Sequence, residues 1–460
     1  MDVCRVRNGV GLLVLLLVLL WIPAGMVEGQ VVAAAGQAPL GGMERASLNF
    51  DGGEGNNDSY QPVTTADGRY VVFQSAADNL VLGDTNGVQD IFLYDRRTQV
   101  IRRLTMGLDG AQTDGDSRRP AVSAAGDVVI FESQATNLVL GGGNGYWQVF
   151  ALDLQRNVVE QVSSAVTGAP GDSDSGQAKV SGDGRFVAFA SRATDLVPGD
   201  TNGRGDVFVY DRSLGEMARV SMSPAGTQSN GNSINPTISA DGRYVAFQSL
   251  ASNLLPECNG IFYQVYLFDH ITKKLTLVSH QAGQMGNDES QRPALSADGR
   301  YVAFESWASN LVVGDTNEVS DIFVYEVETG TVTLASVGAN GATASNVSGS
   351  AVLSADGRYV AFASLADNLV PDDHNYQFDV FLFDRQLGQT LLVSRNGAGG
   401  VGNGPSISPA MSAGGEYVVF DSLASDLVPN DQNARIDVFV LGGASEPIST
   451  QTVFVPLIRR

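Results

Sequence analysis

Oxygen-bearing side chains recur in this sequence with a fixed internal spacing. The pattern is Asp-x-Asn-x-x-x-Asp, which places two carboxylates and one amide in a short segment. Oxygen ligands at alternate positions of a tight loop suit a hard cation, so the pattern predicts a partial ligand set for Ca²⁺, completed by backbone oxygens or water. The five copies are Asp84, Asn86 and Asp90; Asp200, Asn202 and Asp206; Asp315, Asn317 and Asp321; Asp373, Asn375 and Asp379; and Asp431, Asn433 and Asp437.

The same residues also suit a purely structural role. Asp and Asn side chains hydrogen-bond the backbone amides of their own turns, and the last Asp of each copy stands where it can cap a strand. Spacing leaves both interpretations open. We favour the structural role, because the pattern lacks the extra acid and the longer spacing of known calcium loops.

Aromatic residues occupy the corresponding loops in two further copies and accompany the acids in a third. Aromatic side chains at loop tips can form a surface patch that binds a protein or a sugar. Packing against neighbouring loops is the alternative, and it is the simpler explanation. The candidate partner-binding residues are Tyr146, Trp147, Phe262, Tyr263, Tyr376 and Phe378.

Residues that could form an active site are sparse. His270, His280 and His374 form no His-x-x-x-His pair, and no Gly-x-Ser-x-Gly elbow leads into a helical pattern. Carboxylates are plentiful, but they follow a repeat, whereas catalysis needs an asymmetric cluster. The sequence therefore predicts a non-catalytic protein. A hydrolase or lyase acting on an extracellular polymer is the alternative.

A repeated unit must position these loops. The stretch Ser-x-Asp-Gly-Arg-Tyr-Val-Ala-Phe, clearest at residues 239–247, returns seven times with small changes. Successive copies of its last residue are separated by 58, 58, 58, 57, 58 and 58 residues. A fixed period of this size indicates a solenoid, an array or a propeller. These marker residues are Phe73, Phe131, Phe189, Phe247, Phe304, Phe362 and Phe420.

Each copy has the pattern of four short strands. In the fifth copy these are residues 293–296, 301–304, 322–325 and 332–335, with an Asp-Gly turn after the first. The runs are rich in β-branched and aromatic residues and are bounded by Gly, Asp and Asn. Four antiparallel strands repeated seven times describe an all-β, seven-bladed β-propeller.

The chain ends carry a prediction of ring closure. Residues 43–62 match residues 217–236 at an offset of 174, which is three periods of 58. The seventh copy, in turn, supplies only three strands, within residues 409–441. We therefore predict that the N-terminal strand completes the last blade and hides its edges. A strand from the tail, residues 445–460, is the alternative.

The repeat, followed by Asp-Val-Phe-Val-Tyr-Asp at residues 206–211, resembles the TolB-like propeller repeat family, also described as WD-repeat-like. The resemblance covers residues 43–441. It implies a propeller fold, and it implies an exported bacterial protein that acts as a docking surface. One propeller architecture carries many functions, so the resemblance is specific for fold.

Composition and the N-terminal segment limit the partners and the location expected of the protein. A formal charge of −22 argues against nucleic acid and anionic lipid as partners. Residues 1–29 have the pattern of a signal peptide, 30–42 of a linker, 43–441 of the propeller and 442–460 of a tail. The apolar run at residues 10–22 is short for a membrane span, although an uncleaved anchor is the competing interpretation. We expect an exported monomer, periplasmic or extracellular, with no membrane span in the mature chain.

Alternating strand direction assigns the loops to two faces. The links between second and third strands and the links between blades emerge together, on what we call the long-loop face. The Asp-Gly turns emerge on the opposite side, the turn face. Loops on a rigid scaffold are where binding residues concentrate. We therefore predict a secreted, non-catalytic scaffold that binds a protein or a glycan through the long-loop face, with a calcium-stabilised structural propeller as the alternative.

Basic residues recur after the Asp-Gly turns, and one lies in the row expected at the centre of the ring. The Arg residues that follow the Asp-Gly turns are predicted to pair with acids on the same face. Lys179 is the one charged residue in the first-strand row that we expect to line the central channel, which predicts a nearly neutral channel. The turn residues are Arg69, Arg185, Arg243, Arg300 and Arg358.

Overall fold

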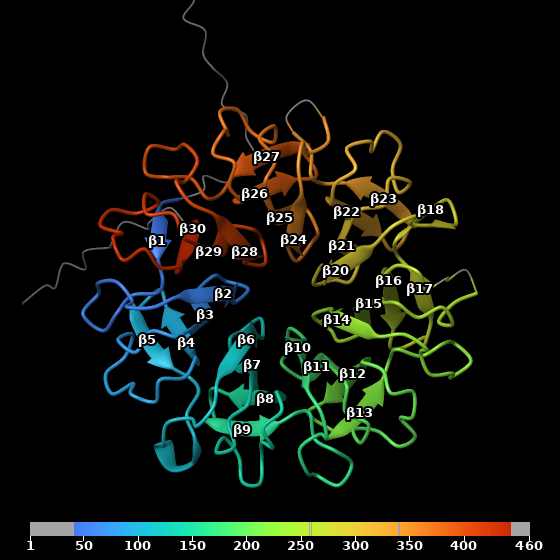
Figure 1. Cartoon of the computed structure of the whole chain (residues 1–460), viewed down its shortest axis with the longest axis horizontal. Helices are drawn as coiled ribbons and strands as arrows, with labels where there is room; N and C mark the ends of the chain where they lie inside the picture. The colour runs from blue at the N-terminus through green and yellow to red at the C-terminus, as the bar shows by residue number, and fades with distance from the viewer. Residues whose placement is uncertain (1–40, 257, 259, 339–340, 443–460) are drawn as a thin grey trace, which may run out of the picture. The chain divides into compact units, whose positions relative to one another are not determined.

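The computed structural model describes residues 41–256, 258, 260–338 and 341–442. The predicted signal peptide (residues 1–29), most of the linker and tail residues 443–460 lie outside this part of the chain. Within it, the chain forms seven four-stranded antiparallel sheets arranged as a ring around a central opening (Figure 1). This arrangement confirms the seven-bladed, all-β prediction.

The blades follow one another along the chain, each running from its inner to its outer strand. Their strands are β2 (Ser59–Thr64), β3 (Tyr70–Ser75), β4 (Asp90–Asp95) and β5 (Val100–Arg103) in blade 1; β6 (Ser117–Val122), β7 (Val128–Ser133), β8 (Gln148–Asp153) and β9 (Val158–Gln161) in blade 2; β10 (Ser175–Val180), β11 (Phe186–Ser191), β12 (Asp206–Asp211) and β13 (Glu216–Arg219) in blade 3; β14 (Ser233–Ile238), β15 (Tyr244–Ser249), β16 (Gln264–Asp269) and β17 (Leu275–Leu277) in blade 4; β20 (Ser290–Leu295), β21 (Tyr301–Ser306), β22 (Asp321–Glu326) and β23 (Thr331–Leu334) in blade 5; β24 (Ser348–Leu353), β25 (Tyr359–Ser364), β26 (Asp379–Asp384) and β27 (Gln389–Leu392) in blade 6; and β28 (Ser406–Met411), β29 (Tyr417–Ser422), β30 (Asp437–Gly442) and β1 (Met43–Arg45) in blade 7.

Small additional elements lie in the links between blades. They are a 3-10 turn, η1 (Leu108–Gly110), and a two-stranded hairpin, β18 (His280–Gln281) with β19 (Gln284–Met285). In the part of the chain that the structure describes, no helix is long and apolar enough to cross a membrane.

The hydrophobic core lies between successive blades. Both middle strands of a blade are apolar on both faces, because each blade is covered by a neighbour on either side. Val72 and Ile91 of blade 1, for example, pack in one cluster with Phe131 of blade 2. Within each blade the marker Phe stacks on an aromatic residue of the third strand, with ring centroids 5.7–6.0 Å apart. The residues that fix the sequence period therefore also fill the core.

The inner strands begin earlier than the sequence pattern indicated. In the fifth copy β20 starts at Ser290, not at residue 293, because a β-bulge interrupts its pairing with β21. Arg292, at the bulge, has a φ of 47°. Bulges of this kind bend the strand and re-aim side chains. The equivalent bulge residues are Gln61, Arg119, Gln177, Asn235, Arg292, Ser350 and Ser408, all with positive φ.

The ring closes through the N-terminal strand. β1 pairs with β30 in antiparallel register, with Met43 opposite Leu441 and Arg45 opposite Phe439. The next amide, of Ala46, donates to the carbonyl of Val438 at 2.8 Å. The prediction that the first strand completes the last blade is thus confirmed.

The turn face is held by side-chain pairs and by the backbone. Arg69 forms an ion pair with Asp95 at 2.7 Å, and Arg185, Arg243 and Arg358 form equivalent pairs, as predicted. Arg300 forms no ion pair among the described residues and lies over the ring of Tyr301 instead. Neighbouring turns are also joined by backbone hydrogen bonds that run completely round the ring. Each N–H donates to a carbonyl of the next turn: Ala66 to Ala124, Ala124 to Gly182, Gly182 to Ala240, Ala240 to Ala297, Asp298 to Ala355, Ala355 to Ala413 and Ala413 to Ala66.

Candidate functional site

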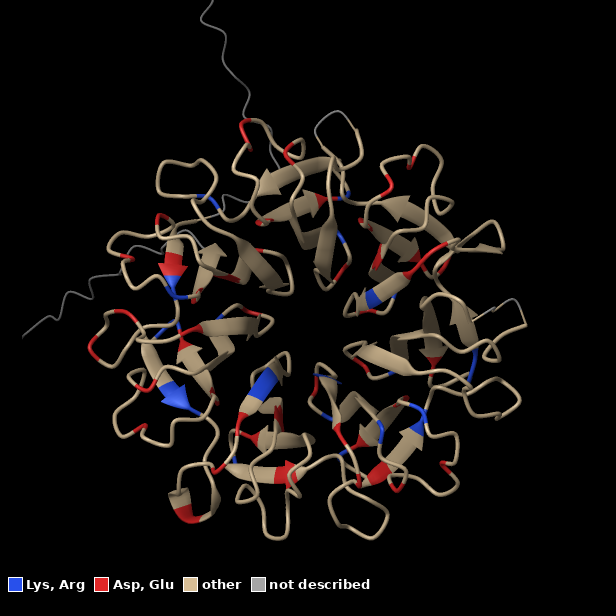
Figure 2. Ribbon diagram, viewed as in Figure 1, with Lys and Arg blue, Asp and Glu red and all other residues tan. Residues whose placement is uncertain are grey.

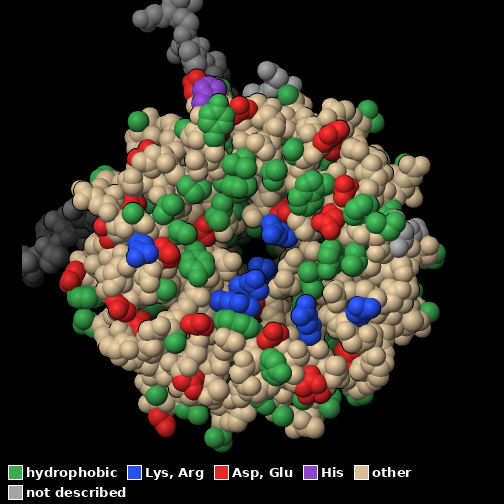
Figure 3. All heavy atoms as spheres, in the orientation of Figure 1, with side chains coloured by type: hydrophobic (Ala, Val, Ile, Leu, Met, Phe, Trp, Pro, Cys, Tyr) green, Lys and Arg blue, Asp and Glu red, His purple; other side chains and the backbone are tan. Residues whose placement is uncertain are grey.

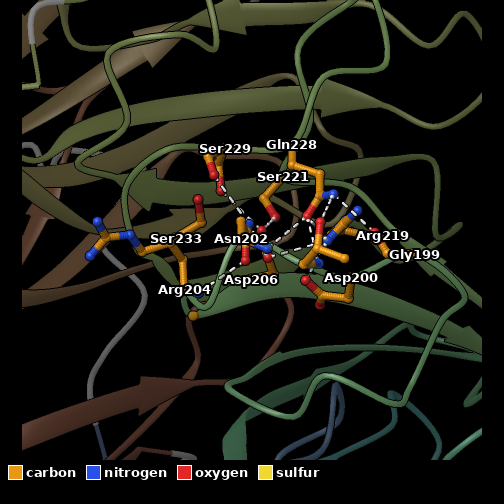
Figure 4. A network of polar contacts seen from close by, with 12 residues as sticks. Gly199, Asp200, Asn202, Arg204, Asp206, Arg219, Ser221, Gln228, Ser229 and Ser233 are labelled. Atoms are coloured by element: carbon orange, nitrogen blue, oxygen red, sulfur yellow. Dashed lines mark hydrogen bonds and ion pairs between the residues drawn. The ribbon is translucent and has the colours of Figure 1, made fainter.

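The Asp-x-Asn-x-x-x-Asp loops form internal polar networks, shown for blade 3 in Figure 4. The Asp206 carboxylate is fully buried. It accepts hydrogen bonds from the hydroxyl of Ser221, from the hydroxyl of Ser229 at 3.0 Å and from the amide of Asn202 at 2.7 Å. The Asn202 side-chain oxygen accepts the backbone N–H of Arg204 at 2.9 Å. Asp206 therefore ties the start of β12 to the end of β13 and to the following link.

The other copies repeat these contacts. In blades 2 and 4, Gln148 and Gln264 take the place of the last Asp, and each accepts a hydroxyl hydrogen bond at 2.6 Å. These contacts support the structural interpretation of the pattern. The hydroxyl donors to the last Asp in the remaining blades are Thr105, Ser336, Ser394 and Ser47, on Asp90, Asp321, Asp379 and Asp437 respectively.

The first Asp of each copy divides the loops into two groups. Arg103 lies 2.7 Å from Asp84, Arg219 lies 2.8 Å from Asp200, and Arg45 of β1 lies 3.4 Å from Asp431. In blades 5 and 6 the position of this Arg on the fourth strand is taken by Leu334 and Leu392. The acids there form no ion pair among the described residues, and burial raises the pKa values of Asp315 and Asp373.

We expect chelation to leave the stability of the protein unchanged. The loop carboxylates already accept hydrogen bonds from Ser, Thr and Asn, and no group of three or more Asp, Glu, His or Cys in the described residues is placed to hold a metal ion. The measurement is the melting temperature in calcium-containing buffer, before and after addition of excess EGTA. A reproducible fall after chelation would instead establish a stabilising cation.

Stability should pass through a maximum near pH 4 to 5. Burial raises the pKa values of Asp321, Asp379 and Asp421 to about 6, so their protonation favours the folded state as the pH falls from about 7 toward their ordinary value near 4. The hydrogen bond from Arg69 lowers the pKa of Asp95 to about 2, so stability falls again below pH 4.

Urea unfolding followed by circular dichroism from pH 3 to pH 8 measures this profile. Asp379→Asn should flatten its high-pH side. A profile that rises steadily toward pH 8 in the wild type would contradict the prediction.

The six aromatic residues fall into separate places. Trp147 and Tyr263 line one pocket of about 330 Å³ on the long-loop face, together with side chains of blades 2, 3 and 4. Tyr146 is exposed beside Trp147, and Phe262 is half-buried. Tyr376, which is 79% exposed, and Phe378 belong to blade 6. The aromatic residues therefore do not form a single patch. We call the first of these places the Trp147 pocket.

The Trp147 pocket exists because blade 3 is recessed between two larger neighbours. Residues one period of 58 apart occupy equivalent positions, and at three such positions blade 3 has only small residues, Gly176, Ala190 and Gly205. The corresponding residues are Arg118, Glu132 and Trp147 in blade 2, and Ile234, Gln248 and Tyr263 in blade 4. Two glycines and an alanine in one blade thus leave a cleft between larger side chains of the blades on either side.

Basic side chains line one wall of the Trp147 pocket. The guanidinium of Arg118 stacks on the ring of Trp147, with its carbon 3.6 Å from the ring centroid. Its Nε donates to the buried carboxylate of Glu132 at 2.8 Å, and Arg119 lies 3.5 Å from the same carboxylate. Glu132 also accepts the backbone N–H of Gln177 at 2.5 Å. Glu132 therefore holds both Arg side chains in place.

The remaining charges of the Trp147 pocket are Arg192 and Asp174. Arg192 directly follows β11, its side chain is exposed, and it forms no ion pair among the described residues. Asp174 accepts the backbone N–H of Trp147 at 2.9 Å. The Arg residues of this pocket depart from the repeat, so the features that the copies share did not predict them. They become visible when residues 58 positions apart are compared and those that differ from the repeat are picked out.

The prediction of a nearly neutral channel is wrong. Lys and Arg side chains gather around the central opening (Figure 3), and β6 and β20 carry basic residues at the inner edge of the ring (Figure 2). Arg119 and Arg292 occupy the bulge position of these strands. The bulge shifts the inward-facing alternation, so the row that contains Lys179 is not the only row at the opening.

Similarity to known proteins is found only among solved structures. No protein-family model matches the sequence, and a search of curated proteins finds no match. Among solved structures, oligogalacturonate lyase in complex with manganese is 14% identical, with a TM-score of 0.51 over 89% of this chain and 98% of that one. The β-propeller domain of the Trilobed protease from Pyrococcus furiosus is 12% identical, with a TM-score of 0.51 over 86% and 98%. The putative TolB from Agrobacterium tumefaciens is 16% identical, with a TM-score of 0.41 over 76% and 97%.

This chain is a seven-bladed β-propeller. The β-propeller domain of the Trilobed protease shares this fold at a TM-score of 0.51. At these identities the likeness carries no activity from one protein to another. The Pyrococcus domain is described as having an open velcro topology, whereas β1 and β30 close the ring in this propeller.

Proposed function

We propose that this propeller is an exported, non-catalytic scaffold that holds a protein or a glycan on its long-loop face. The observation that carries the proposal is the Trp147 pocket, the place where three equivalent positions of the repeat are altered together. Binding residues concentrate on loops and strand ends of rigid scaffolds, and a concave site with a few convergent polar groups is the usual form of a binding site.

The chemistry of the Trp147 pocket favours binding over catalysis. Its two acids are Glu132, which is fully buried and hydrogen-bonded to Arg118, and Asp174, which holds the backbone of Trp147. General acid–base catalysis needs a pair of titratable groups directed at one reacting atom. Glu132 is already engaged inside the wall, so the pocket offers donors and apolar surface for recognition.

The test is retention of a native partner by the full mature chain. Wild-type protein and two variants, Trp147→Ala in the pocket and Tyr376→Ala in blade 6, are immobilised and incubated with envelope extract of the source cells. We expect Trp147→Ala to retain at least tenfold less of the wild-type partner, and Tyr376→Ala to retain it fully. Mass spectrometry of the partner after prolonged incubation should show no cleavage.

Two results would contradict the proposal. Equal retention by Trp147→Ala and wild type would place the binding surface elsewhere. Time-dependent conversion of the retained partner into products would make the protein an enzyme.

A further inference from the structure

We propose that the Trp147 pocket binds an acidic side chain of an extended peptide segment, flanked by neutral or basic residues. This inference rests on the proposed function and names its ligand. Its starting point is the charge of the pocket. Three Arg residues line it, and the carboxylate that orients Arg118 and Arg119 is shielded from solvent inside the wall.

The Arg side chains keep hydrogen-bond donors for an incoming anion. Arg118 uses its Nε for Glu132, which leaves its two terminal nitrogens. The Arg119 side chain is 42% exposed, and Arg192 forms no ion pair within the described chain. Guanidinium groups bind carboxylates through two parallel hydrogen bonds, which makes them selective for this anion. The chemistry expected of the ligand is therefore a carboxylate.

The charge of the rest of the molecule favours a peptide over a polyanion. The chain carries a net charge of −22, and Asp and Glu are spread over the face around the basic centre (Figure 3). Screening confines attraction to a cluster of this kind to about 8 Å at physiological salt. A polysaccharide with a charge on every residue would meet these acids outside the pocket. A peptide with one acid and neutral or basic neighbours meets complementary charge both inside and outside.

The remaining walls suit the rest of such a segment. Trp147, Tyr263 and Ile234 provide apolar surface next to the Arg residues, and Asn232 and the exposed Asp174 also line the pocket. One oxygen of Asp174 accepts the backbone N–H of Trp147, and the second can accept a backbone N–H of a bound peptide. The pocket of about 330 Å³ is at the small end of the range for ligand sites. One or two side chains are the expected occupant.

Gly205 offers a way to close the Trp147 pocket without disturbing the fold. A Cβ at Gly205 would lie 3.7 Å from Asn232 and 3.9 Å from both Arg192 and Ile234, which are ordinary contacts among pocket-lining residues. Its φ lies outside the left-handed region. Phe378 occupies the equivalent position in blade 6. Gly205→Phe should therefore fold as the wild type does and fill the cleft with its ring.

The experiment measures fluorescence polarisation with a library of labelled short peptides with blocked ends. Each contains one Asp or Glu between apolar residues, and each has an Asn or Gln counterpart; a labelled oligo-uronate is the carbohydrate arm. We expect the best acidic peptide to bind the wild type at least tenfold more tightly than its amide counterpart. Gly205→Phe and Arg192→Gln should each weaken this binding at least tenfold, and Tyr376→Ala should leave it unchanged. Melting curves of the variants check folding.

Every outcome decides between the two proposals. Equal affinity for acid and amide, retention of peptide by Gly205→Phe, or no peptide bound at all would overturn the inference. The wild type could instead bind the oligo-uronate and no peptide, and Gly205→Phe could lose that binding. This result would make the ligand a carbohydrate and leave the proposed scaffold function in place. Should Gly205→Phe and Trp147→Ala hold the native partner as wild type does, both proposals fail.

Discussion

A chain that begins at residue 48, without β1, should fail to form a stable propeller. β1 supplies the fourth strand of blade 7, and its loss exposes the hydrogen-bonding edge of β30. It also removes Ser47, whose hydroxyl donates to the fully buried carboxylate of Asp437 at 2.5 Å, and Arg45, which lies 3.9 Å from the same residue. Leaving a buried charge without its partners costs about 3–5 kcal/mol. Loss of the strand pairing adds to this.

Circular dichroism and size-exclusion chromatography measure the outcome. A chain that begins at residue 41 is the control and should melt as a chain that begins at residue 30 does. A synthetic peptide of residues 41–50, added to the shortened chain, should restore a cooperative melting transition by taking the place of β1. A stable monomeric propeller without β1 would show that ring closure contributes little.

Asp206→Ala should be the most destabilising single substitution in the long loops. It removes the acceptor of the buried Ser221 and Ser229 hydroxyls and one acceptor of the Asn202 amide, which keeps its hydrogen bond to the carbonyl of Ser229. Arg219 also loses one of its two acids. An unsatisfied buried group costs about 1–3 kcal/mol, so the expected loss is roughly 3–5 kcal/mol in the free energy of unfolding.

Asp206→Gln is the matched variant, because blades 2 and 4 have Gln148 and Gln264 at this position. Its side-chain oxygen can still accept the Ser221 hydroxyl, so we expect it to cost about half as much as Asp206→Ala. Urea denaturation at pH 7 gives both values. Similar midpoints for the wild type and Asp206→Ala would mean that the network contributes little to stability.

The repeat was sufficient to predict the fold, because a propeller repeats one unit whose core residues recur at equivalent positions. The period of the marker Phe residues predicted seven units, and the β-rich runs predicted four strands in each. The match of residues 43–62 with residues 217–236 predicted the strand that closes the ring. The bulge at Arg292 and its equivalents was not visible, because a positive φ at a non-glycine residue leaves no clear mark in a sequence. The inner strands were therefore placed about three residues too late.

The candidate site was only partly predictable, for a related reason. Trp147 and Tyr263 stood out as aromatic residues in a loop, and the structure brings them to one pocket. Arg118 and Arg119 precede the expected first strand of their copy and Arg192 follows the second strand of the next, so none of the three belongs to a recurring motif. The cleft itself depends on what blade 3 lacks, at Gly176 and Gly205. Absent side chains become informative only when equivalent residues of neighbouring blades are compared in space.

The seven backbone hydrogen bonds that join neighbouring turns give the two ends of the molecule different mechanical properties. They form a closed circle on the turn face, so widening the ring there would require several of these hydrogen bonds to break together. We therefore expect the blades to move relative to one another mainly at the long-loop face. A ligand that binds between blades 2 and 4 would tilt these blades apart at the long-loop face and leave the turn face unchanged.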